Sequence, residues 1–146
     1  VARDEQEHGL RMHLNLGHTF AHGIENSLGY GRLLHGEAVV LGLLAAVELS
    51  WRMAPKRANA LARYRETIGR VMRRIPYRRI DVDAVLRSMQ MDKKRAGAAV
   101  RFVVLDKPGR VKVVSGVRRE LVISALESAL NEYGSIGGRH AAYSHC

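Results

Sequence analysis

Residues 36–53 are the most apolar stretch of the chain, and they limit the folds that the rest can adopt. The helix that they predict is apolar on nearly every side, so other elements must surround it. Its longest apolar run, Ala38–Val47, contains Gly42, precedes Glu48 and is shorter than the roughly 20 residues that span a bilayer. We therefore expect a central buried helix that ends before Pro55, and no membrane-spanning segment.

The flanking segments predict further helices and one β-hairpin. Two β-branched runs, at residues 100–105 and 110–114, are separated by Asp106-Lys107-Pro108-Gly109, a sequence typical of a turn. The expected fold class is therefore mainly α with a small hairpin. Helices are predicted at about residues 10–28, 36–53, 56–72, 81–91 and 118–133, and residues 134–146, rich in Gly, Ser and His, are predicted to be a disordered tail.

The composition is that of one globular domain. The chain has 146 residues, of which 47% are hydrophobic, and this is sufficient for one packed core. The one cysteine, Cys146, is the last residue, so an internal disulfide is excluded and a reducing, cytoplasmic setting is expected. Because the chain begins at Val1 without an initiator Met, we expect a fragment of a longer protein.

The chain carries a net charge of +10, and ten of its basic residues lie between Arg52 and Arg79. Such a charge attracts nucleic acid or a phosphorylated substrate, or it belongs to a solvated helix face. We favour the solvated face, because charge runs are usually solvated and no helix-turn-helix, RNA-recognition or zinc-finger pattern accompanies this one. Nucleic acid is therefore not expected as a partner.

The first predicted helix carries an unusual polar strip. An ordinary surface helix presents Lys and Glu to solvent, whereas this strip presents a guanidinium, an amide and two imidazoles, which bind anions, orient oxygens and hold metals. The strip therefore predicts one wall of an active site. At about 100° per residue, five residues fall within a strip roughly 80° wide: Arg11, Asn15, His18, His22 and Glu25.

A further imidazole, that of His35, opens the central helix. His35 follows His18 across a Gly-containing turn, so a helix-turn-helix return can bring the two rings together. Neutral imidazole is a common ligand of zinc and other divalent transition metals, and Gly36 leaves the approach uncrowded. A catalytic metal takes three protein ligands, and no third is obvious, because Glu25 and Glu37 have structural explanations of equal weight. The pattern predicts an incomplete metal site.

A second cluster of cations, Lys93-Lys94-Arg95, lies between the fourth predicted helix and the first strand. Cations on a loop between a helix and a strand suit a phosphate or a carboxylate. From the residues alone, a solvated basic turn is the favoured interpretation.

Several motifs follow one another in a fixed order along residues 1–133. Together they resemble the 3-dehydroquinate synthase family. The motifs are the lead-in from Arg3 to Arg11, Arg11-x-x-x-Asn15-Leu16-Gly17-His18-Thr19-Phe20-x-His22-x-Ile24-Glu25, Gly29-Tyr30-Gly31, Leu34-His35-Gly36-Glu37-Ala38-Val39, Asp92-Lys93-Lys94 and Ser115-Gly116-Val117.

The resemblance implies a two-domain enzyme of which this chain is the C-terminal domain, at residues 1–133. An N-terminal Rossmann-like domain, absent here, would bind NAD. By motif position, His18 and His35 match two ligands of zinc or cobalt, and the third ligand, a glutamate from an earlier segment, has no counterpart in this chain. A homodimer of the full-length protein is also implied.

The resemblance also implies substrate contacts. Arg11 matches a group that binds the substrate carboxylate. Asn15 and His22, together with Lys93 or Lys94, match groups around the substrate phosphate, and His22 is the expected catalytic proton carrier.

The activity implied is the NAD- and metal-dependent cyclisation of 3-deoxy-arabino-heptulosonate 7-phosphate to 3-dehydroquinate. Phosphate is released, so the enzyme would be a phosphorus–oxygen lyase of the shikimate pathway and of aromatic amino acid biosynthesis. The chain alone is expected to be inactive, because the NAD contacts and the third metal ligand are missing. One departure from the family pattern is Ala21-His22-Gly23 in place of Gly-His-Ala, which costs about 1 kcal/mol in helix propensity.

Three alternatives remain open from the sequence. The first is a related sugar-phosphate cyclase. The second is a metal-dependent alcohol or glycerol dehydrogenase of the same superfamily, against which Arg11, Asn15 and the Lys93-Lys94 pair argue, because such an enzyme has no phosphate to expel. The third is a non-catalytic basic helical domain that associates with nucleic acid.

Overall fold

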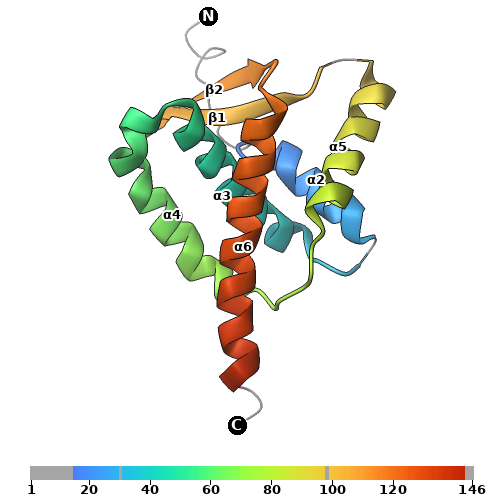
Figure 1. The fold of residues 1–146 in the computed structure, drawn as a ribbon, viewed down its shortest axis with the longest axis vertical. Coiled ribbons are helices and arrows are strands. Elements are labelled where there is room, and N and C mark those ends of the chain that lie inside the picture. Colours follow the sequence, from blue (N-terminus) through green and yellow to red (C-terminus); the bar gives the residue numbers. More distant parts are fainter. Residues whose placement is uncertain (1–14, 30, 98, 144–146) are drawn as a thin grey trace, which may run out of the picture.

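The computed structural model describes residues 15–29, 31–97 and 99–143. Five helices and one hairpin follow one another in these ranges (Figure 1). They are α2 (His18–Leu28), α3 (His35–Met53), a short 3-10 turn (Pro55–Arg57), α4 (Ala58–Met72), α5 (Val82–Ala96), β1 (Arg101–Lys107), β2 (Arg110–Ser115) and α6 (Arg119–Tyr143). The prediction of a mainly helical fold with one small hairpin is confirmed.

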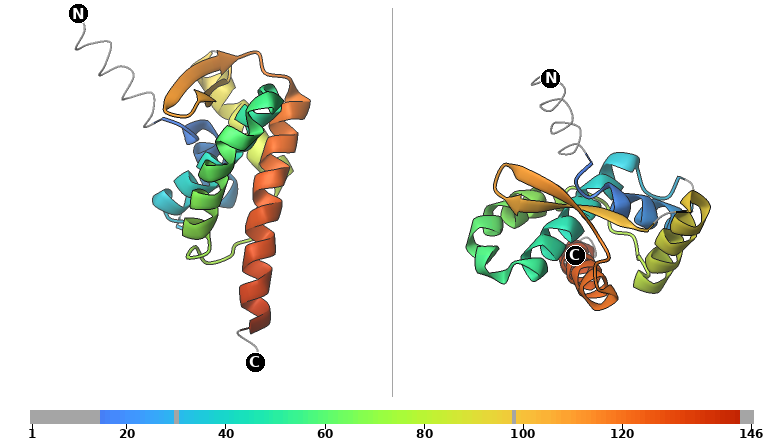
Figure 2. Two further views of the ribbon diagram at one scale, coloured as in Figure 1. Left: turned by 90° about the vertical axis from the view of Figure 1, so that its left-hand side faces the viewer. Right: turned by 90° about the horizontal axis from the view of Figure 1, so that it is seen from above.

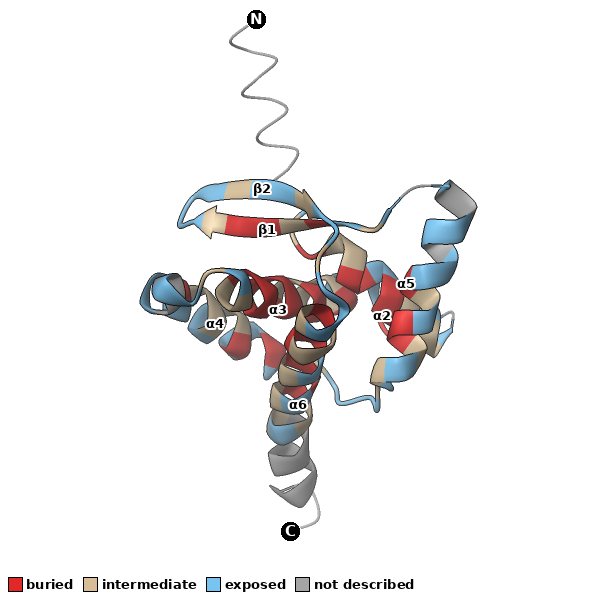
Figure 3. Ribbon diagram, turned by 45° about the horizontal axis from the view of Figure 1, so that its top comes forward, coloured by how far each residue is buried: buried red, intermediate tan, exposed pale blue. Residues whose placement is uncertain are grey.

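Helix α3 is the centre of the molecule. It packs against α2, α4, α6 and β1, and ten of its 19 residues, from Ala38 to Ser50, are buried (Figure 3). The central buried helix expected from residues 36–53 is therefore confirmed. No helix within the described ranges is both long and apolar enough to cross a membrane.

The hairpin lies over one end of α3. Strands β1 and β2 are antiparallel, with Phe102 opposite Val114, and the face of β1 that carries Phe102 and Val104 is buried. The buried Ser50 hydroxyl accepts a hydrogen bond from the Leu105 N–H (2.9 Å) and donates one to an α3 carbonyl (2.6 Å). This hydroxyl joins the hairpin to the central helix.

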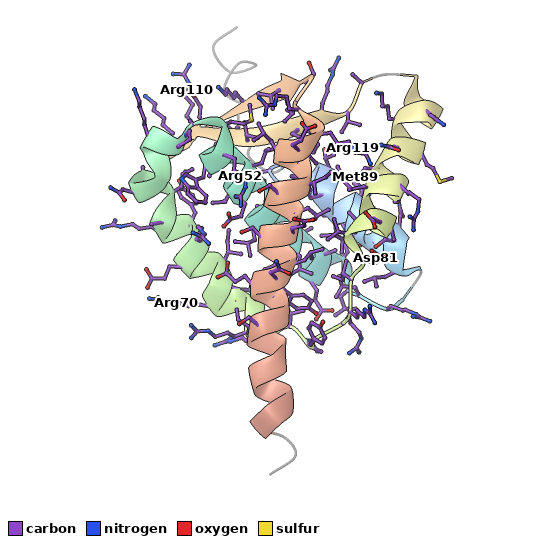
Figure 4. The ribbon with its side chains drawn as sticks, in the orientation of Figure 1. Arg52, Arg70, Asp81, Met89, Arg110 and Arg119 are labelled. Atoms are coloured by element: carbon purple, nitrogen blue, oxygen red, sulfur yellow. The ribbon has the colours of Figure 1, made fainter. Side chains whose placement is uncertain are left out.

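A fully buried carboxylate, that of Glu48, joins three helices. Glu48 lies on α3, and its oxygens pair with Arg52 of the same helix and Arg65 of α4, each at 2.6 Å. The Arg52 Nε also donates to Ser124 of α6 (2.8 Å), and Figure 4 shows Arg52 in the space between the three helices. Both guanidiniums lie within 6 Å of the Trp51 ring centroid, which is the range of a cation–π contact. Two of the ten clustered cations therefore neutralise a buried charge.

Two helix ends differ from the predictions. Helix α5 continues to Ala96 instead of ending near Met91, and Gly97, with a φ of 64°, caps it.

Helix α6 continues to Tyr143. The predicted helix end at Tyr133 is therefore wrong, and so is the predicted disordered tail for residues 134–143. Residues 144–146 lie outside the described ranges. Figure 2 shows that α6 extends past the other helices. Extending an existing helix by one residue is far easier than starting one, so this segment is helical despite its glycines.

The buried Tyr133 hydroxyl anchors the connection between α4 and α5. It donates to the Pro76 carbonyl (2.6 Å) and accepts from the Arg78 N–H (2.8 Å), and its ring packs against that of Tyr77. Burial raises the pKa of Tyr133 above 10.0, its ordinary value, although the hydrogen bond from Arg78 acts in the opposite direction. The neutral phenol is thus the form that the fold stabilises.

We expect Tyr133→Phe to lower the free energy of unfolding by about 1–3 kcal/mol near pH 7, because the substitution leaves two backbone groups unpaired. In the wild-type chain, the raised pKa contributes stability that is present below about pH 10 and is lost as the pH rises through the folded-state pKa. Urea unfolding at about pH 7 and pH 11 measures both effects. The alkaline loss should be smaller in the variant, and equal losses would contradict the assignment.

Candidate functional site

The site begins with a close approach of two backbones. Gly17 ends the turn at residues 15–17 with a φ of 81°, and a Cβ added to it would lie 2.6 Å from backbone atoms of Gly42 and Leu43 in α3. A Cβ on Gly42 would in turn overlap the Gly17 carbonyl oxygen and lie 2.8 Å from the Ala21 nitrogen. Real Cβ atoms do not approach other atoms so closely, so only glycine fits at both positions.

This approach brings three imidazoles together. His18 is the first residue of α2 and His35 is the first residue of α3, and their ring centroids lie 6.2 Å apart with the planes nearly perpendicular. His22, one helical turn beyond His18, also lies with its ring centroid 6.2 Å from that of His18. The expected return of the chain across residues 29–34 therefore juxtaposes the two predicted metal ligands.

The spacing of His18 and His35 suits a shared divalent cation. With zinc–nitrogen bonds of about 2.1 Å and tetrahedral angles, two bound imidazoles have centroids roughly 5 Å apart, so small side-chain rotations suffice from 6.2 Å. The His35 side chain is 62% exposed, and a Cβ on Gly36 would meet nothing within 4 Å, so the approach is open. The described residues contain no group of three His, Cys, Asp or Glu that could hold a metal, so the two imidazoles need a further ligand.

The structure separates the two glutamates that the sequence left as equal alternatives. Glu25 contacts His35, with 2.9 Å between its Oε1 and the ring Nδ1. Glu37 accepts a hydrogen bond from the Leu34 N–H (3.0 Å) and so caps the start of α3. A pocket of about 400 Å³, lined in part by Glu25, Leu33 and His35, opens beside the first pair.

The prediction of a continuous polar strip on the first helix is wrong between Asn15 and His18. Gly17 has a left-handed φ of 81° and α2 begins only at His18, so Asn15 lies exposed in a turn and its direction does not follow the 100° rule. Arg11 lies outside the described residues. His18, His22 and Glu25 do share one helix, and Phe20 and Ile24 are buried on the opposite side of it, as expected.

Lys93 and Lys94 are exposed on the last turns of α5, and the loop expected at their positions is helical. Lys93 lines a pocket of about 240 Å³ between α5, β1 and α6, and Figure 4 shows Met89 and Arg119 facing this space. The Thr19 hydroxyl donates to the Arg101 carbonyl (2.7 Å), so the start of α2 touches β1 just beyond the end of α5. The lysines and the imidazoles therefore belong to neighbouring elements, although no described contact joins them.

Sequence reasoning missed the role of the helix glycines. A Cβ on Gly23 would lie 2.7 Å from Cγ of Met89, so the absence of a side chain lets α5 pack directly against α2. Ala21, one helical turn from Gly17, is buried against Gly42. The family pattern has Gly-His-Ala where this chain has Ala21-His22-Gly23. Ala21 packs against α3 and Gly23 against α5, which accounts for the residues on either side of His22. A signal was available, because an isolated glycine inside an apolar helix often has a packing reason.

Comparisons with known proteins agree with this architecture. The family model described as 3-dehydroquinate synthase C-terminal matches residues 1–95. The 3-dehydroquinate synthase of Nitrosomonas europaea is 41% identical over 130 residues, which cover 89% of this chain and 35% of that protein. The 3-dehydroquinate synthase of Methylococcus capsulatus is 41% identical over 128 residues, 87% of this chain and 36% of that protein. The chain therefore spans about a third of the length of these relatives.

Two solved structures share the fold at lower identity. A 2-deoxy-scyllo-inosose synthase, complexed with carbaglucose-6-phosphate, NAD⁺ and Co²⁺, aligns with a TM-score of 0.63 and 20% identity over 78% of this chain and 32% of that chain. A 2-epi-5-epi-valiolone synthase from Streptomyces hygroscopicus subsp. jinggangensis, with NAD⁺ and Zn²⁺ bound, aligns with a TM-score of 0.62 and 19% identity over 80% of this chain and 32% of that chain.

We expect Gly42→Ala to destabilise the chain by about 1–3 kcal/mol, because the new methyl group pushes the start of α2 away from α3. Gly36→Ala is the matched control: it lies on the same helix, has open space at its Cβ, and should leave stability unchanged or raise it by up to about 1 kcal/mol. Thermal and urea unfolding of both variants measure the difference. Similar stabilities for the two would contradict the close approach.

Proposed function

The chain belongs to the 3-dehydroquinate synthase family, and from this premise we propose that it supplies the metal- and substrate-binding part of a 3-dehydroquinate synthase. The complete enzyme would convert 3-deoxy-arabino-heptulosonate 7-phosphate into 3-dehydroquinate and phosphate, as a phosphorus–oxygen lyase of the shikimate pathway. The observation that carries this proposal is the adjacency of His18 and His35 at the first residues of two packed helices.

His18 and His35 would hold the divalent metal, zinc or cobalt. Both lie at helix starts that the Gly17–Gly42 approach holds together, and imidazole nitrogen suits either metal. When bound, the metal would act as a Lewis acid that favours loss of a proton from the substrate alcohol and polarises the resulting ketone. The third ligand would come from outside the described residues.

Four further positions would hold the substrate. Arg11 is assigned to the carboxylate, since a guanidinium makes paired hydrogen bonds to it. Asn15 and one of Lys93 or Lys94 are assigned to the phosphate, where cations would position the leaving group. His22 would carry a proton to or from the departing phosphate, and its exposure beside His18 supports this role.

The remaining parts of the enzyme follow from the same premise. The C-terminal domain would include residues 1–133, with α6 continuing beyond them to Tyr143, and a separate Rossmann-like domain would bind NAD. The solved relatives of this fold contain NAD⁺ together with Co²⁺ or Zn²⁺, which supports both cofactors here. The full-length protein would act as a homodimer in the cytoplasm.

The reactions of other sugar-phosphate cyclases are the first alternative, because the two solved relatives are a 2-deoxy-scyllo-inosose synthase and a 2-epi-5-epi-valiolone synthase. Such an enzyme would also use a divalent metal and would differ in its substrate, so substrate turnover by the complete enzyme separates the alternatives. A dehydrogenase is disfavoured by the cations at Lys93 and Lys94. A non-catalytic basic domain that binds nucleic acid is disfavoured because Arg52 and Arg65 are engaged with Glu48.

In the protein completed with its NAD-binding domain, His18→Ala and His35→Ala should each abolish retention of zinc. His8→Ala and His13→Ala are the matched controls, because they remove imidazoles that the proposal does not use, and they should retain the metal. Mass spectrometry measures the zinc content of all four variants after dialysis. Equal losses of zinc in the four variants would contradict the proposed metal site.

We also expect the purified 146-residue chain to form no 3-dehydroquinate by itself, because the NAD contacts and the third metal ligand lie elsewhere. Addition of the N-terminal domain of a relative, such as the 41% identical Nitrosomonas protein, should restore turnover. Phosphate release with and without that domain is the measurement. Turnover by the chain alone would refute this part of the proposal.

A further inference from the structure

A side-chain hydrogen bond between Glu25 and His35 joins α2 to α3. Glu25 lies in the second half of α2, and its Oε1 lies 2.9 Å from Nδ1 of His35 at the first residue of α3. The carboxylate is only 24% exposed, whereas the imidazole is 62% exposed. The less exposed partner therefore restrains the more exposed one.

The chemistry of this contact determines the tautomer of His35. A carboxylate only accepts hydrogen bonds, so a neutral imidazole must place its hydrogen on Nδ1 to make the contact. The other nitrogen, Nε2, then carries the free lone pair. A metal binds the nitrogen that has no hydrogen, and the hydrogen bond made by the other nitrogen decides which one that is.

Glu37 does not compete for this role. Its carboxylate accepts the Leu34 N–H at 3.0 Å and so stabilises the start of α3. Residue spacing leaves Glu25 and Glu37 with equal weight as ligands or structural residues, and their hydrogen bonds distinguish them. Glu25 pairs with the candidate ligand His35, whereas Glu37 caps the start of α3.

We propose that Glu25 is a positioning residue of the metal centre, which fixes the ring of His35 so that Nε2 is offered to a divalent cation shared with His18. This inference rests on the proposed function, since it needs His35 to be a ligand. Carboxylates that hold the second nitrogen of a metal-bound imidazole typically change metal affinity by about 10- to 100-fold when removed. Their loss also frees the ring to rotate.

The first test reads the tautomer directly, without metal. In the ¹⁵N-histidine-labelled chain at about pH 8, long-range ¹H–¹⁵N correlations distinguish the Nδ1–H from the Nε2–H form. We expect His35 to be mainly Nδ1–H in the wild type and in Glu37→Gln, the control that removes a nearby charge, and to shift toward Nε2–H in Glu25→Ala. An unchanged His35 spectrum in Glu25→Ala would overturn the inference.

The second test titrates Zn²⁺ into the same labelled chains and follows the histidine signals, which report weak as well as tight binding. We expect Glu25→Ala to weaken zinc binding by about 10-fold or more, and Glu37→Gln to leave it unchanged. Equal affinity in the wild type and Glu25→Ala would overturn the positioning role and leave the metal site standing. Equal affinity in the wild type and His18→Ala would instead overturn the proposed metal site.

Discussion

The architecture of this domain depends on the contact between the Gly17 and Gly42 backbones. Without side chains at these two positions, the first turn of α2 lies directly against the middle of α3. Because His18 follows Gly17 immediately, that contact also fixes where the first imidazole sits relative to α3 and His35. The same few residues therefore determine how α2 packs against α3 and where His18 lies, and a methyl group at the contact would disturb both.

The domain has a packed interior and an exposed surface that carries the candidate functional side chains. Helix α3 is enclosed by four other elements, and the Ser50, Tyr133 and Thr19 hydroxyls tie the hairpin, the connection between α4 and α5, and α2 to their neighbours. The side chains of His22, His35, Lys93 and Lys94, in contrast, are exposed to solvent, and that of His18 is partly exposed. A site that must admit a cation and an anionic sugar requires accessible groups, and a packed scaffold is what holds such groups in position.

Much of the fold was predictable, because periodicity and turn residues are local signals. The central helix, the hairpin and the adjacency of His18 and His35 followed from apolar spacing, from Pro108-Gly109 and from the short return between two helices. The predictions that failed concerned features that depend on contacts between residues far apart in the sequence. The break at Gly17 follows from its approach to Gly42, α5 continues to a glycine cap at residue 97, and α6 grows from a packed segment into Gly-rich sequence. The contacts of Glu25 and Glu37 required the positions of two helices, which residue spacing alone does not provide.

The buried Glu48 has a consequence for how this sequence can diverge. One carboxylate is shared by Arg52 and Arg65, so replacing any one of the three leaves a charge with an incomplete set of partners in the interior. A joint replacement by apolar residues of similar volume avoids that cost, because no charge remains to be compensated. Descendants of this sequence should therefore keep the three residues together or lose them together, and intermediates should be rare. Trp51, whose ring centroid lies within 6 Å of both guanidiniums, is expected to vary with them.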